Sequence, residues 1–355
     1  MPLEAACTGN TIGSLGRDVE LAANYLDLFS GYGTELKGDS VPASKDGIHF
    51  SIREPYGVVA RIVPFNHPFL FAAAHLAAPL MAGNTVIVNT PETSPLTGTL
   101  MGEICRDVLP PGVVNIVHGP GLPTGDALVR HPKIWRIGFT GSVHTGLAIQ
   151  RSAAEVAVKH ISLELGGKNP MIVCPDADPA TVAKAAVGGM NFAWAGQSCG
   201  SNSRLLVHES LYDEVVARVV AQVSAIKVGD ALDPASQMGP LNSAAHYQRV
   251  LSFVESARQD GAKLLTGGER PVGEAFRRGY WLRPTVYGDV TMSMRVAREE
   301  IFGPIISILK WQTQEEAIAM ANATEYGLAA GVWTHDLKAA MTFARKLQAG
   351  FVWIN

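Results

Sequence analysis

The 355-residue chain is 47% hydrophobic and 17% charged, a composition typical of a globular α/β enzyme with one large or two ordinary cores and not of a disordered protein. Its formal net charge is −3 and its 29 Lys and Arg form no pronounced run, which argues against nucleic acid as a partner. The N-terminus lacks a basic region followed by an apolar run, so we expect no signal peptide and no membrane span.

Four cysteines, Cys7, Cys105, Cys174 and Cys199, are scattered without a CxxC spacing. This pattern is typical of neither a disulfide framework nor a structural zinc site. We therefore expect no metal, and a reducing, cytoplasmic compartment.

The first half of the chain alternates strand and helix patterns. Residues 18–37 have apolar residues at helical spacing, and residues 47–54 alternate like an exposed strand. Strands are then predicted at 58–63, 85–88, 113–117, 135–139 and 161–165, with helices at about 68–81, 94–108, 122–130 and from Ser142. This alternation predicts a parallel sheet covered by helices, with ligands beyond the carboxyl ends of its strands.

A second alternating set follows. It begins with a strand at 170–174 and a helix that has Asp178 as N-cap, has Pro179 at its first position and ends near Gly196. Further strands are predicted at 204–208, 305–310 and 329–334, with helices near 211–226, near 243–259 and from Asp336. Cys199 is thus placed on a loop before a strand, where rigid elements can hold a reactive group.

Glu164 and Cys199 are the candidate catalytic pair. A thiolate attacks carbonyl carbon well, and a nearby carboxylate can take a proton from the thiol or from water. On the pair alone, the cysteine is more often a small buried hydrophobe.

Six motifs occur in one order: ProPheAsnHisPro (64–68), GlyAsnThrValIleVal (83–88), PheThrGlySer (139–142), LeuGluLeuGlyGlyLysAsnPro (163–170), GlyGlnSerCys (196–199) and GluIlePheGlyPro (300–304). Over essentially the whole chain this series resembles the aldehyde dehydrogenase superfamily. The resemblance implies an α/β fold: a Rossmann-like parallel-sheet NAD-binding domain (1–40 and 57–166), a projecting β oligomerisation arm (41–56) and a second α/β catalytic domain (167–355). Compared with the family, the chain looks like a fragment that lacks both ends.

The resemblance also assigns catalytic roles. It implies that Cys199 forms a thiohemiacetal with an aldehyde, that the Asn66 amide and the Cys199 backbone N–H bind the oxyanion, and that Glu164 activates the water that hydrolyses the thioester. Without the family, Asn66 is read as a turn residue and Glu164 as a cap of the turn at 166–167.

The same resemblance implies an NAD site, with NADP less favoured. Its residues are Val63, Pro64, Phe65, Asn89, Glu92, Gly121, Phe139, Gly141, Ser142, Gly146, Leu165, Glu300 and Phe302. The helix that begins at Ser142 would receive the pyrophosphate, and the Glu92 carboxylate would bind ribose hydroxyls and repel a 2′-phosphate. Glu300 and Phe302 match residues that hold the nicotinamide ribose and flank its ring, although ordinary packing is an equal reading for Phe302.

Two positions depart from the family pattern. Asn89 stands where a lysine is common, which removes a cation beside the adenosine ribose. His75 replaces a second common lysine, and it could titrate near neutrality in a proton relay or serve only in packing.

The substrate pocket is expected to draw on Phe69, Phe71, Phe192 and Trp194, which suggest an apolar or aromatic aldehyde, although aromatics at such spacing are more often core. A cysteine thioesterase or esterase would use the same acyl-enzyme, and a CoA-acylating enzyme usually lacks a base like Glu164. The non-enzyme alternative is an inactive assembly subunit. The arm predicts a homodimer or homotetramer, because it would otherwise expose a strand edge.

Overall fold

The computed structural model describes residues 1–355. The chain forms two compact units, one of residues 14–165 with Met1 and Leu3, and one of residues 166–355 with Pro2 and residues 4–13. Both are built from strands that alternate with helices, which confirms the predicted α/β class. No helix combines the length and the apolar character that crossing a bilayer requires.

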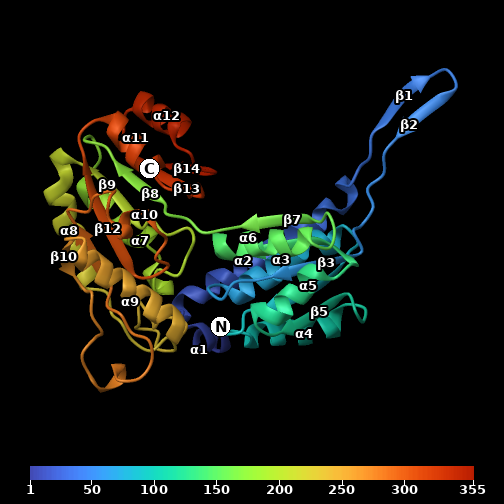
Figure 1. Ribbon diagram of the computed structural model, residues 1–355, viewed down its shortest axis with the longest axis horizontal. Helices are drawn as coiled ribbons and strands as arrows, with labels where there is room; N and C mark the ends of the chain where they lie inside the picture. Colours follow the sequence, from blue (N-terminus) through green and yellow to red (C-terminus); the bar gives the residue numbers. More distant parts are fainter. The chain divides into compact units, whose positions relative to one another are not determined.

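The first unit contains a five-stranded parallel sheet of order β5-β4-β3-β6-β7 (Figure 1). Its strands are β3 (Val58–Ile62), β4 (Thr85–Thr90), β5 (Val114–His118), β6 (Ile134–Thr140) and β7 (His160–Glu164). All five were predicted. After β3 the chain adds β4 and β5 on one side, and then β6 and β7 on the other. The strand order therefore changes direction between β3 and β6, and in open α/β sheets such a point is where ligands bind.

Helices cover both faces of this sheet and create two cores. They are α2 (Ile12–Gly31), α3 (Pro68–Met81), α4 (Leu96–Val108), α5 (Asp126–Arg130) and α6 (Val143–Ala154). One core joins Val86 and Val88 of β4 to Ala72 of α3 and Met101 of α4. The other core, on the opposite face, joins strand residues such as Ile137 to α6. These cores fix the carboxyl edge of the sheet, where the predicted site residues of the first unit lie.

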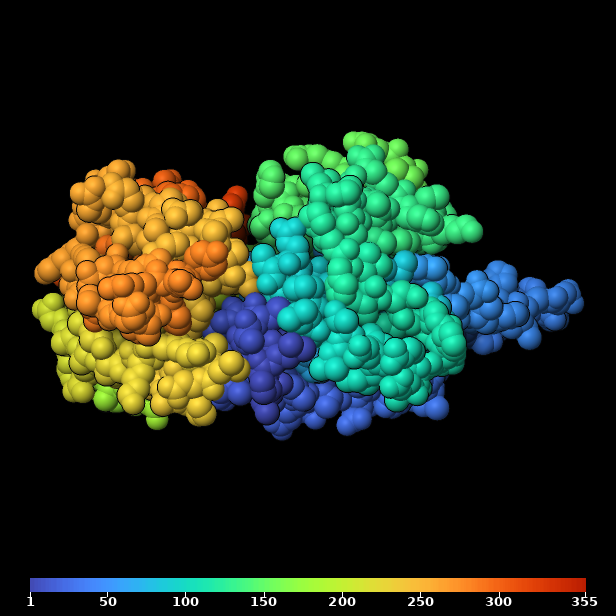
Figure 2. Space-filling view, turned by 90° about the horizontal axis from the view of Figure 1, so that it is seen from below, coloured from blue at the N-terminus to red at the C-terminus, as the bar shows by residue number.

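A hairpin projects from the rest of the first unit (Figures 1 and 2). It pairs β1 (Ser40–Ser44) with β2 (Gly47–Phe50) in antiparallel register. The sequence predicted one strand over 47–54, but the strand ends at Phe50 and its partner β1 was not anticipated. Val41, Ile48 and Phe50 are 57%, 72% and 73% exposed, so the hairpin buries little of its own apolar surface.

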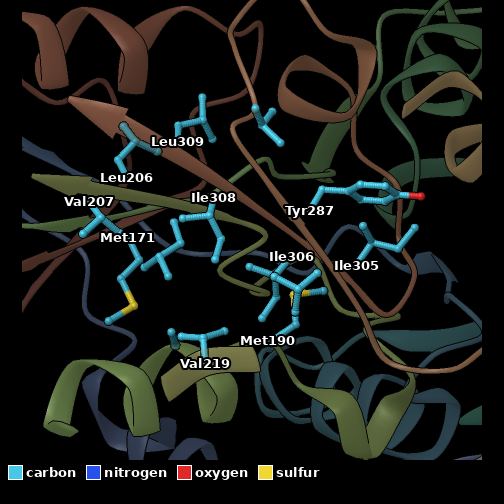
Figure 3. Close-up of a cluster of buried hydrophobic side chains, with 14 of the residues drawn as sticks. Met171, Met190, Leu206, Val207, Val219, Tyr287, Ile305, Ile306, Ile308 and Leu309 are labelled. Carbon is cyan, nitrogen blue, oxygen red and sulfur yellow. The ribbon is translucent and has the colours of Figure 1, made fainter. Parts of the chain in front are cut away.

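The second unit contains a seven-stranded sheet of order β10-β11-β12-β9-β8-β13-β14. Its strands are β8 (Pro170–Val173), β9 (Arg204–His208), β10 (Lys263–Thr266), β11 (Thr285–Gly288), β12 (Ile305–Trp311), β13 (Ala329–Trp333) and β14 (Phe351–Ile354). All neighbours are parallel except β10 and β11. Met171, Leu206, Ile306 and Ile308 pack in its core with Val219 (Figure 3).

The helices of the second unit are α7 (Pro179–Gly189), α8 (Tyr212–Ser224), α9 (Ala244–Gln259), α10 (Arg295–Arg298), α11 (Gln314–Asn322) and α12 (Leu337–Lys346), and a further short helix is α1 (Pro2–Thr8). Asp178 caps α7 as predicted, because its Oδ2 accepts a 2.8 Å hydrogen bond from the Thr181 N–H. The prediction that α7 continues to Gly196 is wrong. Asn191 and Ala195 have φ of 58° and 51°, a left-handed backbone that ends an α-helix.

Candidate active site

The segment that follows β3 holds Asn66 at the carboxyl edge of the first sheet. Asn66 is 3% exposed. The Ser94 hydroxyl donates a 3.2 Å hydrogen bond to the Phe65 carbonyl, and His67 Nδ1 lies 2.7 Å from Asp18 Oδ2. Contacts of the residues on both sides of Asn66 therefore hold its backbone in place.

The turn after β6 lies beside the end of β7. The Gly141 N–H donates a 3.0 Å hydrogen bond to the Glu164 carbonyl, and the Glu164 side chain is exposed. A Cβ at Gly141 would lie 2.5 Å from the buried Phe139 ring, so only glycine fits there. Ser142 is the N-cap of α6, and its Oγ accepts a 3.2 Å hydrogen bond from the Thr145 N–H.

Close packing extends to the first turn of α6, where a Cβ at Gly146 would lie 3.0 Å from Leu165 Cδ2. The structure thus brings together the predicted residues Phe139, Gly141, Ser142, Gly146 and Leu165. Val63 joins the same edge, because its N–H donates a 3.1 Å hydrogen bond to the Asn89 carbonyl across β3 and β4. Pro64 and Phe65 follow it in the chain.

Asn89 is buried at the end of β4, with a side-chain exposure of 3%. Its Nδ2 donates hydrogen bonds of 3.2 Å to the Val117 carbonyl and 3.4 Å to the Gly119 carbonyl. The amide therefore ties β4 to the turn after β5. Glu92 and Gly121, which follow β4 and β5, are exposed.

His75 does not titrate near neutrality, so that reading of its position is wrong. Burial within α3, followed by the charge of Arg61, lowers the pKa of His75 to about 4. Its ring centroid lies 5.3 Å from that of Phe71. These contacts favour the alternative reading, a neutral histidine that packs.

In the second unit, Cys199 lies on the loop between α7 and β9. The loop has a left-handed backbone at Asn191, Ala195 and Gly196, and a Cβ at Gly196 would lie 2.3 Å from the Gly303 carbonyl oxygen. The Cys199 side chain is half-buried. The loop is therefore shaped by its backbone and packs directly on the segment that contains Glu300 and Phe302.

The turn of residues 166–169 holds the Cys199 loop from the other side. Asn169 Nδ2 donates hydrogen bonds of 2.7 Å to the Cys199 carbonyl and 3.1 Å to the Ser201 carbonyl, while its Oδ1 accepts one of 3.1 Å from the Ala329 N–H. A Cβ at Gly167 would lie 2.7 Å from the Cys199 carbonyl oxygen. In the sequence, only its place in the motif 163–170 marks Asn169, and that place alone predicts no role for it.

Glu300 contacts the same turn. The Gly167 N–H donates a 3.0 Å hydrogen bond to Glu300 Oε1, and a Cβ at Gly166 would lie 2.2 Å from Oε2. Its backbone is also held: the N–H donates to the Tyr326 hydroxyl at 3.4 Å, and the carbonyl accepts from Arg249 at 2.9 Å. Burial raises the pKa of Glu300, and the Gly167 N–H and nearby cations oppose that rise.

Phe302 has a left-handed backbone with φ of 58°. Its carbonyl lies 2.7 Å from His246 Nε2, and the two rings meet edge to face at 5.9 Å. Burial lowers the pKa of His246, and the hydrogen bond to the Phe302 carbonyl opposes that change. A bulky residue in this region is strained, and strain of this kind concentrates at functional sites.

The four aromatic residues proposed for a substrate pocket do not share one environment. Phe192 is 5% exposed and belongs to the core of the second unit, so its proposed place in a pocket is wrong. Phe69 and Phe71 are half-buried on α3, and Trp194 is half-buried before Cys199.

Comparison with known proteins agrees with this architecture. The family model described as "Aldehyde dehydrogenase family" matches residues 1–355. The chain is 45% identical over 360 residues to aldehyde dehydrogenase tropH of Talaromyces stipitatus, covering 99% of this chain and 70% of that protein.

Two solved structures are similarly related. PnpE from Pseudomonas sp. WBC-3 has a TM-score of 0.96 and 38% identity, covering 99% of this chain and 72% of that one, and PnpE is also known in complex with nicotinamide adenine dinucleotide. A 3,6-anhydro-L-galactose dehydrogenase in complex with NAP has a TM-score of 0.97 and 34% identity. The match covers 99% of this chain and 74% of that one. A match over every residue to the family model, with relatives of this identity and coverage, shows that the chain belongs to the aldehyde dehydrogenase family.

Proposed function

We propose that this chain oxidises an aldehyde to a carboxylate with NAD⁺ as hydride acceptor, through a covalent intermediate on Cys199. The observation that carries the proposal is the turn of residues 166–169. Its Asn169 amide holds the Cys199 carbonyl, and its Gly167 N–H holds the Glu300 carboxylate. A thiol and a carboxylate suited to a ribose thus lie on two loops that one turn fixes.

The first step is addition to the substrate. The Cys199 thiolate attacks the aldehyde carbon, a C–S bond forms and the carbonyl oxygen becomes an oxyanion. The Asn66 amide and the Cys199 backbone N–H stabilise that oxyanion, and loss of one such donor reduces the rate by about 10²–10³. The burial of Asn66 supports this role, because a fixed donor needs no reorganisation during the reaction.

Oxidation and then hydrolysis follow. A nicotinamide dinucleotide, when bound, would supply the oxidant, as acceptor of the hydride that leaves the former aldehyde carbon. Cys199 then carries a thioester. Glu164 takes a proton from water, the hydroxide attacks the thioester carbon, the C–S bond breaks and the thiolate is restored with release of the carboxylate. Glu164 is exposed at the end of β7, which leaves its carboxylate open to water.

The carboxyl edge of the first sheet fits a dinucleotide. Gly141 leaves no room for a Cβ, and Ser142 caps a twelve-residue helix whose N-terminus favours an anion such as pyrophosphate. Val63, Pro64, Phe65, Glu92, Gly121, Gly146 and Leu165 would complete the site. One solved relative holds NAD and another NAP. We propose NAD⁺ here, because the exposed Glu92 carboxylate repels a 2′-phosphate.

The substrate proposed is an apolar or aromatic aldehyde. Phe69, Phe71 and Trp194 are half-buried, so each retains exposed ring surface that an apolar substrate can cover. We also propose a cytoplasmic location, on the scattered spacing of the four cysteines in the sequence.

NADH absorbance tests the proposed function. Wild-type protein mixed with NAD⁺ and a panel of aliphatic and aromatic aldehydes should form NADH, and Cys199→Ala should form none. Glu164→Gln should give a burst of about one NADH per active site followed by slow turnover, because thioester formation precedes the step that needs the base. Aldehyde-dependent NADH formation by Cys199→Ala would exclude the thiol as nucleophile.

We also propose that the protein is a homodimer or homotetramer assembled through the β1–β2 hairpin. Its exposed Ile48 and Phe50 support this, because exposed apolar surface on a projecting strand pair marks a contact site. The double variant Ile48→Lys, Phe50→Lys should have a lower mass by light scattering than the wild type, that of a smaller oligomer or of the monomer. Val272→Lys, at a residue that is 95% exposed in the second unit, is the matched control. An unchanged mass in the hairpin variant would contradict the proposal.

A further inference from the structure

Lys168 is a buried cation that the proposed mechanism does not use. The residue is 1% exposed, and its Nζ has no hydrogen-bond partner. Removing an ammonium from water without pairing it is strongly unfavourable. A charge kept at this cost indicates a task for the charge itself, since a methionine of similar length would fill the same space without the penalty.

The other cation near Lys168 is fully engaged elsewhere. Arg204 is also 1% exposed. Its Nε donates a 2.9 Å hydrogen bond to the Lys168 carbonyl, and its two terminal nitrogens donate to the Met320 and Ala321 carbonyls at 2.8 Å each. Arg204 therefore anchors the backbone of the turn, while the Lys168 side chain is left to act by its charge alone.

The carboxylate that most favours the charged form of Lys168 is Glu300. Its Oε1 accepts the N–H of Gly167, the residue that directly precedes Lys168. The only other cation acting on it is Arg249, which binds the Glu300 backbone carbonyl and not the carboxylate. Glu300 is half-buried and is not hydrogen-bonded to any cationic side chain. Its ionised form is favoured by the Gly167 N–H first, and then by through-space attraction from Lys168 and Arg249.

We propose that Lys168 is a positioning residue that keeps Glu300 ionised, so that Glu300 can accept hydrogen bonds from the hydroxyls of the nicotinamide ribose. This inference rests on the proposed function, because it takes Glu300 as a cofactor-binding carboxylate. A protonated Glu300 would lose half of its acceptor capacity and bind a diol less well.

The surroundings of Lys168 and Glu300 shift the pKa of each group towards its neutral form. Burial first, and Arg204 second, lower the pKa of Lys168 to about 7, while burial raises the pKa of Glu300. The ammonium therefore becomes predominantly charged as the pH falls below 7, the range in which Glu300 would otherwise take up a proton. Glu299 also faces Lys168 but is half-exposed and paired with Arg295. Burial raises the pKa of Tyr326, so Tyr326 stays neutral.

The test is the affinity for NAD⁺, measured by calorimetry on the full protein between pH 5.5 and pH 8.5. Wild-type affinity should fall on the acidic side as Glu300 protonates. Lys168→Met should move that fall to higher pH by about one unit, weakening binding roughly 3- to 10-fold near pH 6 while leaving it within about twofold at pH 8.5. Lys310→Met removes an exposed lysine of the same unit and should leave the profile unchanged.

Glu300→Gln supplies the second arm, because it removes the titrating carboxyl. Its NAD⁺ affinity should be weaker but flat across this pH range, and adding Lys168→Met should change it by less than about twofold. Two results would overturn the inference and leave the proposed function standing. One is an equal loss of NAD⁺ affinity at all pH values in Lys168→Met, and the other is a decrease of affinity at acidic pH that occurs at the same pH in Lys168→Met as in the wild type. Absence of NAD⁺ binding by the wild-type protein at every pH overturns the proposed function and the inference together.

Discussion

The Asn169 side chain donates a 2.7 Å hydrogen bond to the carbonyl oxygen of Cys199. The same amide binds the Ser201 carbonyl and the Ala329 N–H, so one side chain that is 1% exposed connects the thiol-bearing loop to β13. A buried amide with these three bonds holds its partners in one arrangement, because breaking any of them leaves a buried polar group unpaired. Asn169 is thus a side-chain support of the loop that bears Cys199.

Asn169→Ala should lower kcat by at least about tenfold and destabilise the protein by about 2–4 kcal/mol, because it unpairs three backbone groups. NADH formation and urea unfolding measure the two effects. Asn322→Ala is the control: it also joins two backbone groups of the second unit, Lys346 O and Gln348 N. It should cost stability without a comparable loss of kcat. Equal kcat losses in the two variants would count against a specific role for Asn169.

Gly167→Ala should displace the nucleophile. A Cβ there would lie 2.7 Å from both the Cys199 carbonyl oxygen and Asn169 Oδ1. The first atom is backbone, and the second is held by the Ala329 N–H. We expect activity to fall at least about tenfold. Gly188→Ala introduces the same methyl group into α7, where nothing lies within 4 Å, and should stabilise the protein by about 0.5–1 kcal/mol. Normal activity in Gly167→Ala would show that the two loops can separate without cost.

Alkylation should distinguish the cysteines. Burial raises the pKa of the Cys105 thiol and, with Asp176, raises that of Cys174 to about 12. Iodoacetamide at pH 8 should therefore modify half-buried Cys199 well before Cys105 and Cys174, as peptide mass spectrometry would show. Cys7 is also half-buried, and Cys7→Ser should keep activity whereas Cys199→Ser should lose it. Rapid labelling of Cys174 in the native protein would contradict this assignment.

Lys168→Met should stabilise the protein, most strongly at and below pH 7. The folded-state pKa of about 7 lies below the ordinary 10.5 of lysine, so between these values the unfolded chain binds the additional proton. Stability therefore rises with pH across this window, and the penalty is complete below pH 7. Urea unfolding at pH 6.5, 8 and 9.5 should show this rise in the wild type and a smaller one in the variant. Parallel profiles would show that Lys168 does not titrate in the folded protein.

The fold followed from the sequence where periodicity was strong. Five strands of the first unit and β9 of the second appear where alternating apolar runs predicted them, because parallel buried strands consist of apolar residues almost throughout. The short strands β10, β11 and β14 were missed. A strand of only four residues carries little periodic signal in the sequence. Whether such a segment becomes a strand is decided by its pairing with distant neighbours.

Residue types and motifs predicted which residues belong to the candidate site, but not the roles that depend on contacts between distant segments. Asn169 and Lys168 stood within a recognised motif, but their roles depend on Cys199 and Glu300, which lie far along the chain and are brought to the turn by the second sheet. His75 shows the opposite error. Its residue type suggested titration near neutrality, whereas burial and Arg61 set its pKa.

The β1–β2 hairpin has a thermodynamic consequence. Its strands are five and four residues long, and an isolated two-stranded hairpin is marginally stable in water. With Ile48 and Phe50 exposed, the hairpin obtains little stability from its own chain. Under the proposed assembly, ordering of the hairpin and association of chains become one coupled equilibrium. Order in the hairpin then depends on protein concentration, and dilution alone is enough to loosen the β1–β2 pair.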